Sequence, residues 1–198
     1  MGTNTPWGIS DGQKTLLPGI ISYSTPSHGG IHVKPELNKL IHLAWRHDDG
    51  WYEEDLDWAI VAYHFPESFK PEDRALVIST LKNWKPYSYM KVTGVTLTVD
   101  ESSTLREDTW KTAHKDHLQV VSAVGDWHEN VPKGFVGVTM CLGGRLNSGQ
   151  YASKEFRYFL VPDADYVLPF AIEDANKYQE VDKDYRLLTR QCDHAEVR

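Results

Sequence analysis

The sequence predicts an α+β protein: a mostly antiparallel sheet with helices packed on one face, folded as a single domain. Three observations carry this prediction. Helical spacing of apolar residues is confined to the first half of the chain. Apolar, strand-like runs fill most of the second half. The length of 198 residues and the hydrophobic share of 40% suffice for one sizeable core.

The chain begins with a segment that has no apolar periodicity. Glycine and proline interrupt residues 1–18, so we expect an irregular arm there. Residues 19–24 are β-branched and aromatic, which is typical of a strand. Residues 26–30 read PSHGG and predict a turn, because proline presets one dihedral and glycine permits positive φ. A returning strand at residues 31–33 completes a hairpin.

Three helices are predicted after the hairpin. The first runs from Pro35 to about residue 45, with apolar residues at helical spacing. The second begins near Tyr52 with three acids in its first turn, where the helix dipole favours negative charge. Its body is apolar on nearly all sides up to Pro66, which indicates burial. The third covers residues 71–84.

The remaining elements are mostly strands. The alternation in residues 92–99 predicts a strand with a bulge at Gly94. Ser102 or Ser103 is a candidate N-cap for a short helix that reaches Trp110. Strands are expected at residues 118–124, 134–142 and 156–161. Residues 177–198 are mostly polar and predict a surface tail, so the domain is expected to span residues 19–176.

Composition argues against several classes of function. The formal net charge of −7 and pI near 5.7 argue against nucleic-acid binding, which needs a basic surface. Cys141 lies in an apolar run and is expected to be a buried free thiol. The chain shows no signal-peptide pattern and no apolar run near about 18 residues. We therefore expect a cytoplasmic protein without membrane contact.

The first candidate site is the hairpin turn. Its polar side chains and glycines are Ser24, Thr25, Ser27, His28, Gly29 and Gly30. A hydroxyl and an imidazole act together only where their side chains meet, and neighbours on a turn usually diverge. Three interpretations stay open: a structural turn, a contact with a ligand or partner at bare glycine backbone, and catalysis by His28.

The second candidate site is the segment that carries Trp51, Glu53, Glu54 and Asp55. Capping of a helix explains these acids most simply, but Glu54 and Asp55 are also candidate catalytic carboxylates beside His28. Helical geometry places Glu53, Asp57 and His64 roughly on one face. Their spacing matches no known metal motif, so neither a metal site nor a cofactor is predicted. We expect this segment and the hairpin turn to meet in one patch.

The third candidate site combines a loop with a glycine pair. Asp126 and His128 lie in the loop of residues 125–133, and Arg145 follows Gly143 and Gly144. A glycine pair before arginine is able to cradle an anion, but without a phosphate-loop motif the signal is weak. Ordinary ion pairs explain such residues equally well.

Several phrases of the sequence resemble a family of uncharacterised domains from bacteriophages and plasmids of Proteobacteria. They are TPWG (5–8), ISYSTPSHGGIHV (21–33), GWYEEDLDWAIVA (50–62), SAVGDWHENVPKGFVGVT (122–139) and FLVPDADY (159–166). Members of that family occur within large polyvalent or antirestriction-associated proteins. The resemblance implies an origin in a mobile genetic element and a role in counter-defence, and it transfers no established active site.

The expected function is that of a phage- or plasmid-encoded binding protein. It would bind a host defence protein, or a small nucleotide-like ligand that signals for it, through polar loops on a rigid scaffold. The alternative is a hydrolase or transferase that uses His28 with Glu54 or Asp55. A third interpretation is nucleic-acid mimicry by surface acids. The sequence does not determine the oligomeric state.

Overall fold

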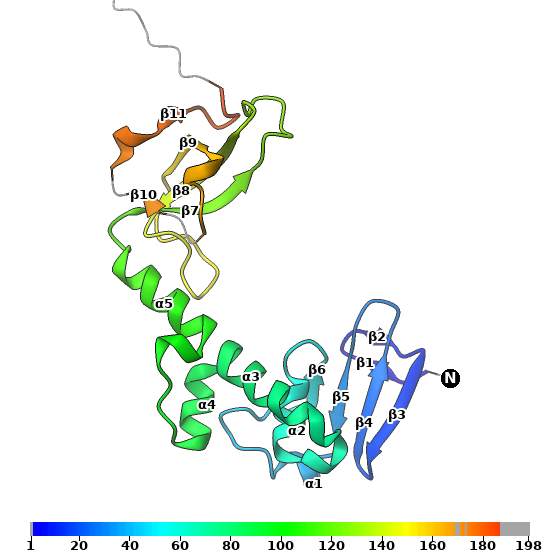
Figure 1. Cartoon of the computed structure of the whole chain (residues 1–198). Coiled ribbons are helices and arrows are strands. Elements are labelled where there is room, and N and C mark those ends of the chain that lie inside the picture. Colours follow the sequence, from blue (N-terminus) through cyan, green and yellow to red (C-terminus); the bar gives the residue numbers. More distant parts are fainter. Residues whose placement is uncertain (1, 169–170, 173, 187–198) are drawn as a thin grey trace, which may run out of the picture. The chain divides into compact units, whose positions relative to one another are not determined.

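The protein is described from a computed structural model, which covers residues 2–168, 171–172 and 174–186 (Figure 1). Its residues group into two compact units, Met1–Arg106 and Glu107–Arg198, and each is described by itself. Both units contain an antiparallel sheet, and the chain also forms helices, which confirms the α+β class. The predicted domain boundaries at residues 19 and 176 stay a prediction.

The first unit contains a four-stranded antiparallel sheet in the order β3-β4-β5-β6 and a two-stranded ribbon, β1-β2. Its elements are β1 (Asn4–Thr5), β2 (Gly8–Ile9), β3 (Gly12–Leu17), β4 (Ile20–Ser24), β5 (Gly29–Val33), α1 (Pro35–Asn38), β6 (Trp51–Glu53), α2 (Trp58–His64), α3 (Arg74–Trp84) and α4 (Pro86–Thr93). Helix α5 (Ser103–Ala113) leads from the first unit into the second.

One face of the four-stranded sheet carries the core. The predicted hairpin is present, since β4 and β5 pair with Tyr23 opposite Gly30. Side chains alternate between the two faces of a strand, so Ile31 and its partner Tyr52 point to the same side. They pack with α2 and α3 residues such as Ile60 and Leu81 in one buried cluster. The predicted burial of the apolar helix before Pro66 is therefore confirmed.

The irregular N-terminal arm predicted for residues 1–18 is wrong for most of its length. Residues Gly12–Leu17 form β3, which pairs with β4, and the register shifts between Thr15 and Leu17. The segment reads GQKTLL and lacks the β-branched run that marks a strand by itself. Its strand conformation comes from the neighbouring β4, whose backbone supplies hydrogen-bond partners.

The helix predicted for residues 35–45 ends at Asn38. The Arg46 guanidinium donates hydrogen bonds to the carbonyls of Lys39 and Ile41, which holds the following residues in turns. The helix predicted from Tyr52 begins only at Trp58. Residues Trp51–Glu53 pair with β5 instead. Strand β5 provides hydrogen-bond partners for backbone N–H groups that would have none in the first turn of a helix.

The strand predicted for residues 92–99 is wrong. Pro86 occupies the first turn of α4, where its missing N–H costs no hydrogen bond, and the helix runs to Thr93. Gly94 then ends it with a left-handed conformation, φ 73°. The alternating sequence after Gly94 forms no strand, whereas the short helix predicted after Ser103 is present as α5.

The second unit is built on a five-stranded antiparallel sheet in the order β10-β7-β8-β9-β11. Its strands are β7 (Leu118–Val124), β8 (Phe135–Leu142), β9 (Phe156–Pro162), β10 (Ala171–Ile172) and β11 (Gln179–Val181). The three long strands match their predicted positions. Strand β11 falls within the predicted polar tail and pairs with β9, while residues 187–198 of that tail lie outside the described residues.

Two further predictions bear on the class of protein. Cys141 is fully buried as a free thiol, as predicted. Among the described helices, none has the length and apolar character needed to cross a membrane.

Candidate functional site

The hairpin turn between β4 and β5 is held by its own hydroxyl groups. The Thr25 hydroxyl donates to the carbonyl of His28 at 2.7 Å and accepts from the His28 backbone N–H at 3.1 Å. The Ser24 hydroxyl donates to the carboxylate of Asp11 at 2.9 Å. The hydroxyl groups of Ser24 and Thr25 therefore bond to backbone groups or to a carboxylate, and not to an imidazole. The His28 side chain is exposed.

The structure brings the hairpin turn and the acidic segment together. Gly30 of β5 pairs with Glu53 of β6, and the backbone N–H of Glu54 donates to the carbonyl of Gly29 at 3.2 Å. As a result, one imidazole nitrogen of His28 and one carboxylate oxygen each of Glu53 and Asp55 all lie within 4.8 Å of one another. We call these three residues the rim.

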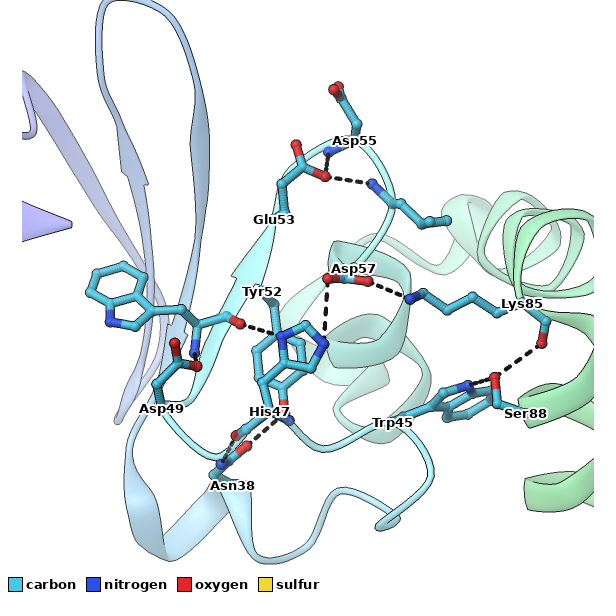
Figure 2. A network of polar contacts seen from close by, with 12 residues as sticks. Asn38, Trp45, His47, Asp49, Tyr52, Glu53, Asp55, Asp57, Lys85 and Ser88 are labelled. Atoms are coloured by element: carbon cyan, nitrogen blue, oxygen red, sulfur yellow. Dashed lines mark hydrogen bonds and ion pairs between the residues drawn. The ribbon is translucent and has the colours of Figure 1, made fainter. Parts of the chain in front are cut away.

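Glu53 is oriented within the rim by backbone donors. Its Oε2 accepts hydrogen bonds from the N–H groups of Asp55 at 2.9 Å and Leu56 at 3.1 Å (Figure 2). The Glu54 carboxylate lies against Gly29 instead. Because side-chain directions alternate along β5, Gly29 faces opposite to Gly30, the partner of Glu53, so the Glu54 carboxylate lies on the face opposite Glu53. The carboxylates beside His28 are therefore those of Glu53 and Asp55.

Aromatic side chains continue the same face of the sheet. Trp7, Tyr23 and His32 surround Trp51, with ring centroids 5.8, 5.4 and 4.6 Å from the Trp51 ring. We call these four residues the aromatic face, and all four are partly exposed. The Trp7 ring lies over Gly30, where a side chain would exclude it. Burial lowers the pKa of His32 below 6.5, an effect that Asp49 partly offsets.

Behind the rim, a polar network fixes β6 and the start of α2 (Figure 2). Asp57 contacts Lys85 Nζ at 2.8 Å and His47 Nε2 at 3.5 Å, and His47 Nδ1 lies 2.8 Å from the carbonyl of Trp51. The Tyr52 hydroxyl donates to Asn38 Oδ1 at 2.6 Å, and burial raises the Tyr52 pKa to about 12. This network positions the scaffold and is separate from the rim.

The predicted common helical face of Glu53, Asp57 and His64 does not form, because Glu53 lies in strand β6 and only Asp57 and His64 belong to α2 and its N-cap. The His64 ring packs edge-on against Trp45, and its Nδ1 lies 2.9 Å from the carbonyl of Ile60. Its Nε2 accepts the backbone N–H of His42 at 3.1 Å. Both bonds fit the neutral imidazole that carries its proton on Nδ1. Burial lowers the His64 pKa below 6.5, against a raising effect of the Ile60 carbonyl.

We therefore expect stability to fall as the pH drops below 6.5. The unfolded chain takes up the His64 proton near pH 6.5, whereas the folded protein resists it until a lower pH. Urea unfolding at several pH values between 7 and 5 measures this loss. His64→Gln should flatten the pH dependence while retaining a residual slope from His32. Parallel slopes for the two proteins would exclude His64 as the cause.

The third candidate site belongs to the second unit, and its side chains have local partners. Asp126 accepts the backbone N–H of Gly134 at 3.2 Å and lies 3.6 Å from Lys133 Nζ. His128 Nδ1 accepts the backbone N–H of Asn130. Arg145 donates to the Tyr151 hydroxyl at 2.9 Å and lies over its ring. Each of the three side chains thus has a partner within its own loop, and a binding role for them stays a prediction.

A cavity in the first unit has no counterpart in the sequence analysis. Its volume is about 430 Å³, and it opens between α2, α3 and the two short 3₁₀ turns at Pro66–Ser68 and Pro71–Asp73. Its lining is largely apolar, with the charged side chains of Lys70, Asp73 and Arg74. Its residues come from segments that only tertiary folding brings together, so helical periodicity alone gives no sign of it.

One family model, described as "Domain of unknown function (DUF7007)", matches residues 1–115. The chain belongs to this family. The matched part of the DUF7007 protein contains the whole first unit, including the rim, the aromatic face and the cavity. No curated protein and no solved structure matches the chain.

Proposed function

We propose that this DUF7007 protein is a binding protein whose contact surface is formed by the rim and the adjoining aromatic face. The observation that carries the proposal is the convergence of His28, Glu53 and Asp55 beside a cluster of partly exposed aromatic rings. Aromatic side chains surrounded by polar groups are the usual composition of a protein–protein contact.

The chemistry of this surface favours a protein partner with a basic patch. Glu53 and Asp55 have no lysine or arginine within ion-pair distance in the part of the chain that the structure describes. Their charges are therefore available to lysine or arginine side chains of a partner. A signalling ligand would suit the cavity between α2 and α3 better, because that cavity is concave and largely apolar.

We further propose that the partner is a component of a host defence system, and that the protein acts from a phage or plasmid by occluding it. The resemblance of the quoted sequence phrases to mobile-element domains supports this role. The small size of the first unit and its fixed backbone around the rim are compatible with stoichiometric blocking of a partner surface.

The proposal is tested with the double substitution His28→Ala, Asp55→Ala. On a host that carries the relevant defence system, expression of the wild-type protein should restore phage plaque formation, and the double variant should fail to do so. Binding to the purified partner should weaken at least ~10-fold, since two central contacts are lost. The melting temperature should stay within about 2 °C, because both side chains are exposed.

Glu36→Ala provides the matched control. Glu36 is exposed on α1, which follows the Val33 end of β5, whereas His28 precedes the Gly29 end of the same strand. The control removes one charge from the same unit and should retain full activity. Equal activity of the double variant and the control would exclude the rim as the contact surface.

A hydrolase or transferase is the second candidate, and the distance between His28 and the two carboxylates favours it. Groups within 4.8 Å can exchange a proton through one bridging water. Asp55→Asn distinguishes the two functions, because it keeps the size of the side chain and removes the base. A binding protein should act in proportion to its own amount, whereas an enzyme should act at far below one equivalent and lose this turnover in Asp55→Asn.

A further inference from the structure

We propose that the rim is a binding site for one divalent transition-metal ion of the Zn²⁺ or Mn²⁺ class. The ligands are one imidazole nitrogen of His28 and one carboxylate oxygen each of Glu53 and Asp55. The sequence predicts that the two segments meet but not this set of ligands, because the β5–β6 pairing decides which carboxylates lie beside His28.

The geometry requires only small side-chain movements to surround an ion. The three donor atoms lie within 4.8 Å of one another. In a tetrahedral site with donors about 2.0–2.2 Å from the metal, the donors lie roughly 3.4 Å apart. Rotation of the exposed His28 and Asp55 side chains closes this difference without any change of the backbone.

The backbone that carries the ligands is already fixed. Thr25 bonds both the N–H and the carbonyl of His28, and the Gly29 carbonyl accepts from the N–H of Glu54. Glu53 is held through Oε2 by two backbone donors, which leaves Oε1 for an ion. Hydrogen bonds to a ligating carboxylate are a regular feature of metal sites, because they orient the ligand before the ion arrives.

The charge and the donor types indicate which ion fits. Two carboxylates lie together, and the described residues place no lysine or arginine within 4.0 Å of either. A divalent cation would neutralise this charge. The imidazole nitrogen favours Zn²⁺ over Mg²⁺ and Ca²⁺, which prefer oxygen ligands alone, and the two carboxylates also admit Mn²⁺. Three protein ligands also leave open positions, which water is able to fill.

The inference does not depend on the proposed binding function, since metal binding is measured on the purified protein alone. Isothermal titration of the chelator-treated protein with Zn²⁺ should give one equivalent of tight binding. His28→Ala, Glu53→Gln and Asp55→Asn should each weaken it at least ~10-fold, and Mg²⁺ at the same concentration should not compete. Glu36→Gln removes one carboxylate at the far end of β5 and should leave the affinity unchanged.

Because the chain has nine histidines, a second measurement locates the ion. Substoichiometric Mn²⁺ should broaden the His28 ring signals in the NMR spectrum before those of His42 or His117. Circular dichroism of each variant verifies that it is folded. The inference is overturned if Zn²⁺ does not bind the wild-type protein at millimolar concentration. It is equally overturned if the folded rim variants bind Zn²⁺ as tightly as Glu36→Gln, or if Mn²⁺ broadens other histidines first.

Discussion

Gly30→Ala is expected to lower the free energy of unfolding by about 3 kcal/mol, at the upper end of the cost of overpacking. A Cβ atom at Gly30 would overlap the Trp7 ring and would lie 2.6 Å from the backbone oxygen of Tyr52. The ring can move aside, but the oxygen belongs to β6 and moves only if β5 and β6 separate. Urea unfolding measures the loss.

Gly125→Ala is the matched control for this substitution. A Cβ atom there also meets a tryptophan, Trp127, at 3.1 Å, but this side chain is 78% exposed and free to turn away. The control should change stability by less than about 0.5 kcal/mol. If Gly30→Ala is equally mild, the close contact between Trp7 and the β5–β6 pair does not exist in solution.

Lys85→Met is expected to cost about 2 to 3 kcal/mol of stability. The side chains of Asp57 and Lys85 are 14% and 25% exposed and form an ion pair at 2.8 Å. Removing the lysine leaves a largely buried carboxylate whose remaining ion-pair partner, among the residues that the structure describes, is His47 at 3.5 Å. The unpaired charge, rather than the lost attraction, accounts for most of this cost.

Two further variants separate this explanation from a loss of packing. Asp57→Asn in the Lys85→Met background should recover part of the stability, because it removes the unpaired charge. Lys111→Met breaks the ion pair with Glu107, whose side chain is 60% exposed, and should cost less than about 0.5 kcal/mol. If the double variant is less stable than Lys85→Met, the contribution of the lysine is one of packing.

The sequence predicts the elements whose signals are local. Strands β4, β5, β7, β8 and β9 and helix α3 lie where alternation and helical spacing place them. The predictions fail at segments whose conformation is decided by a neighbouring strand. Strand β3 depends on β4, and Trp51–Glu53 forms a strand because β5 offers partners to a segment that otherwise resembles a helix start.

The candidate site shows the same division. The sequence predicts that the hairpin turn and the acidic segment meet, and the grouping of His28 with Glu53 and Asp55 confirms it. It does not predict that Glu54 lies against Gly29 on the opposite face, because this follows from the turn after β6, which the sequence presents as the first turn of a helix. The sequence also does not predict the contact of Trp7 with Gly30 or the ion pair of Asp57 with Lys85. Each joins residues more than twenty positions apart, and the periodicity of a helix or strand does not extend over that distance.

The two outermost strands of the four-stranded sheet have a consequence for colloidal behaviour. An exposed strand edge is a template on which a second chain can add a strand and begin to aggregate. The shift in register between Thr15 and Leu17 interrupts the edge offered by β3, and Lys14 adds a charge to it. At the other edge, β6 is only three residues long and leads into acids. Both edges thus discourage the growth of a continuous intermolecular sheet, even at high concentration.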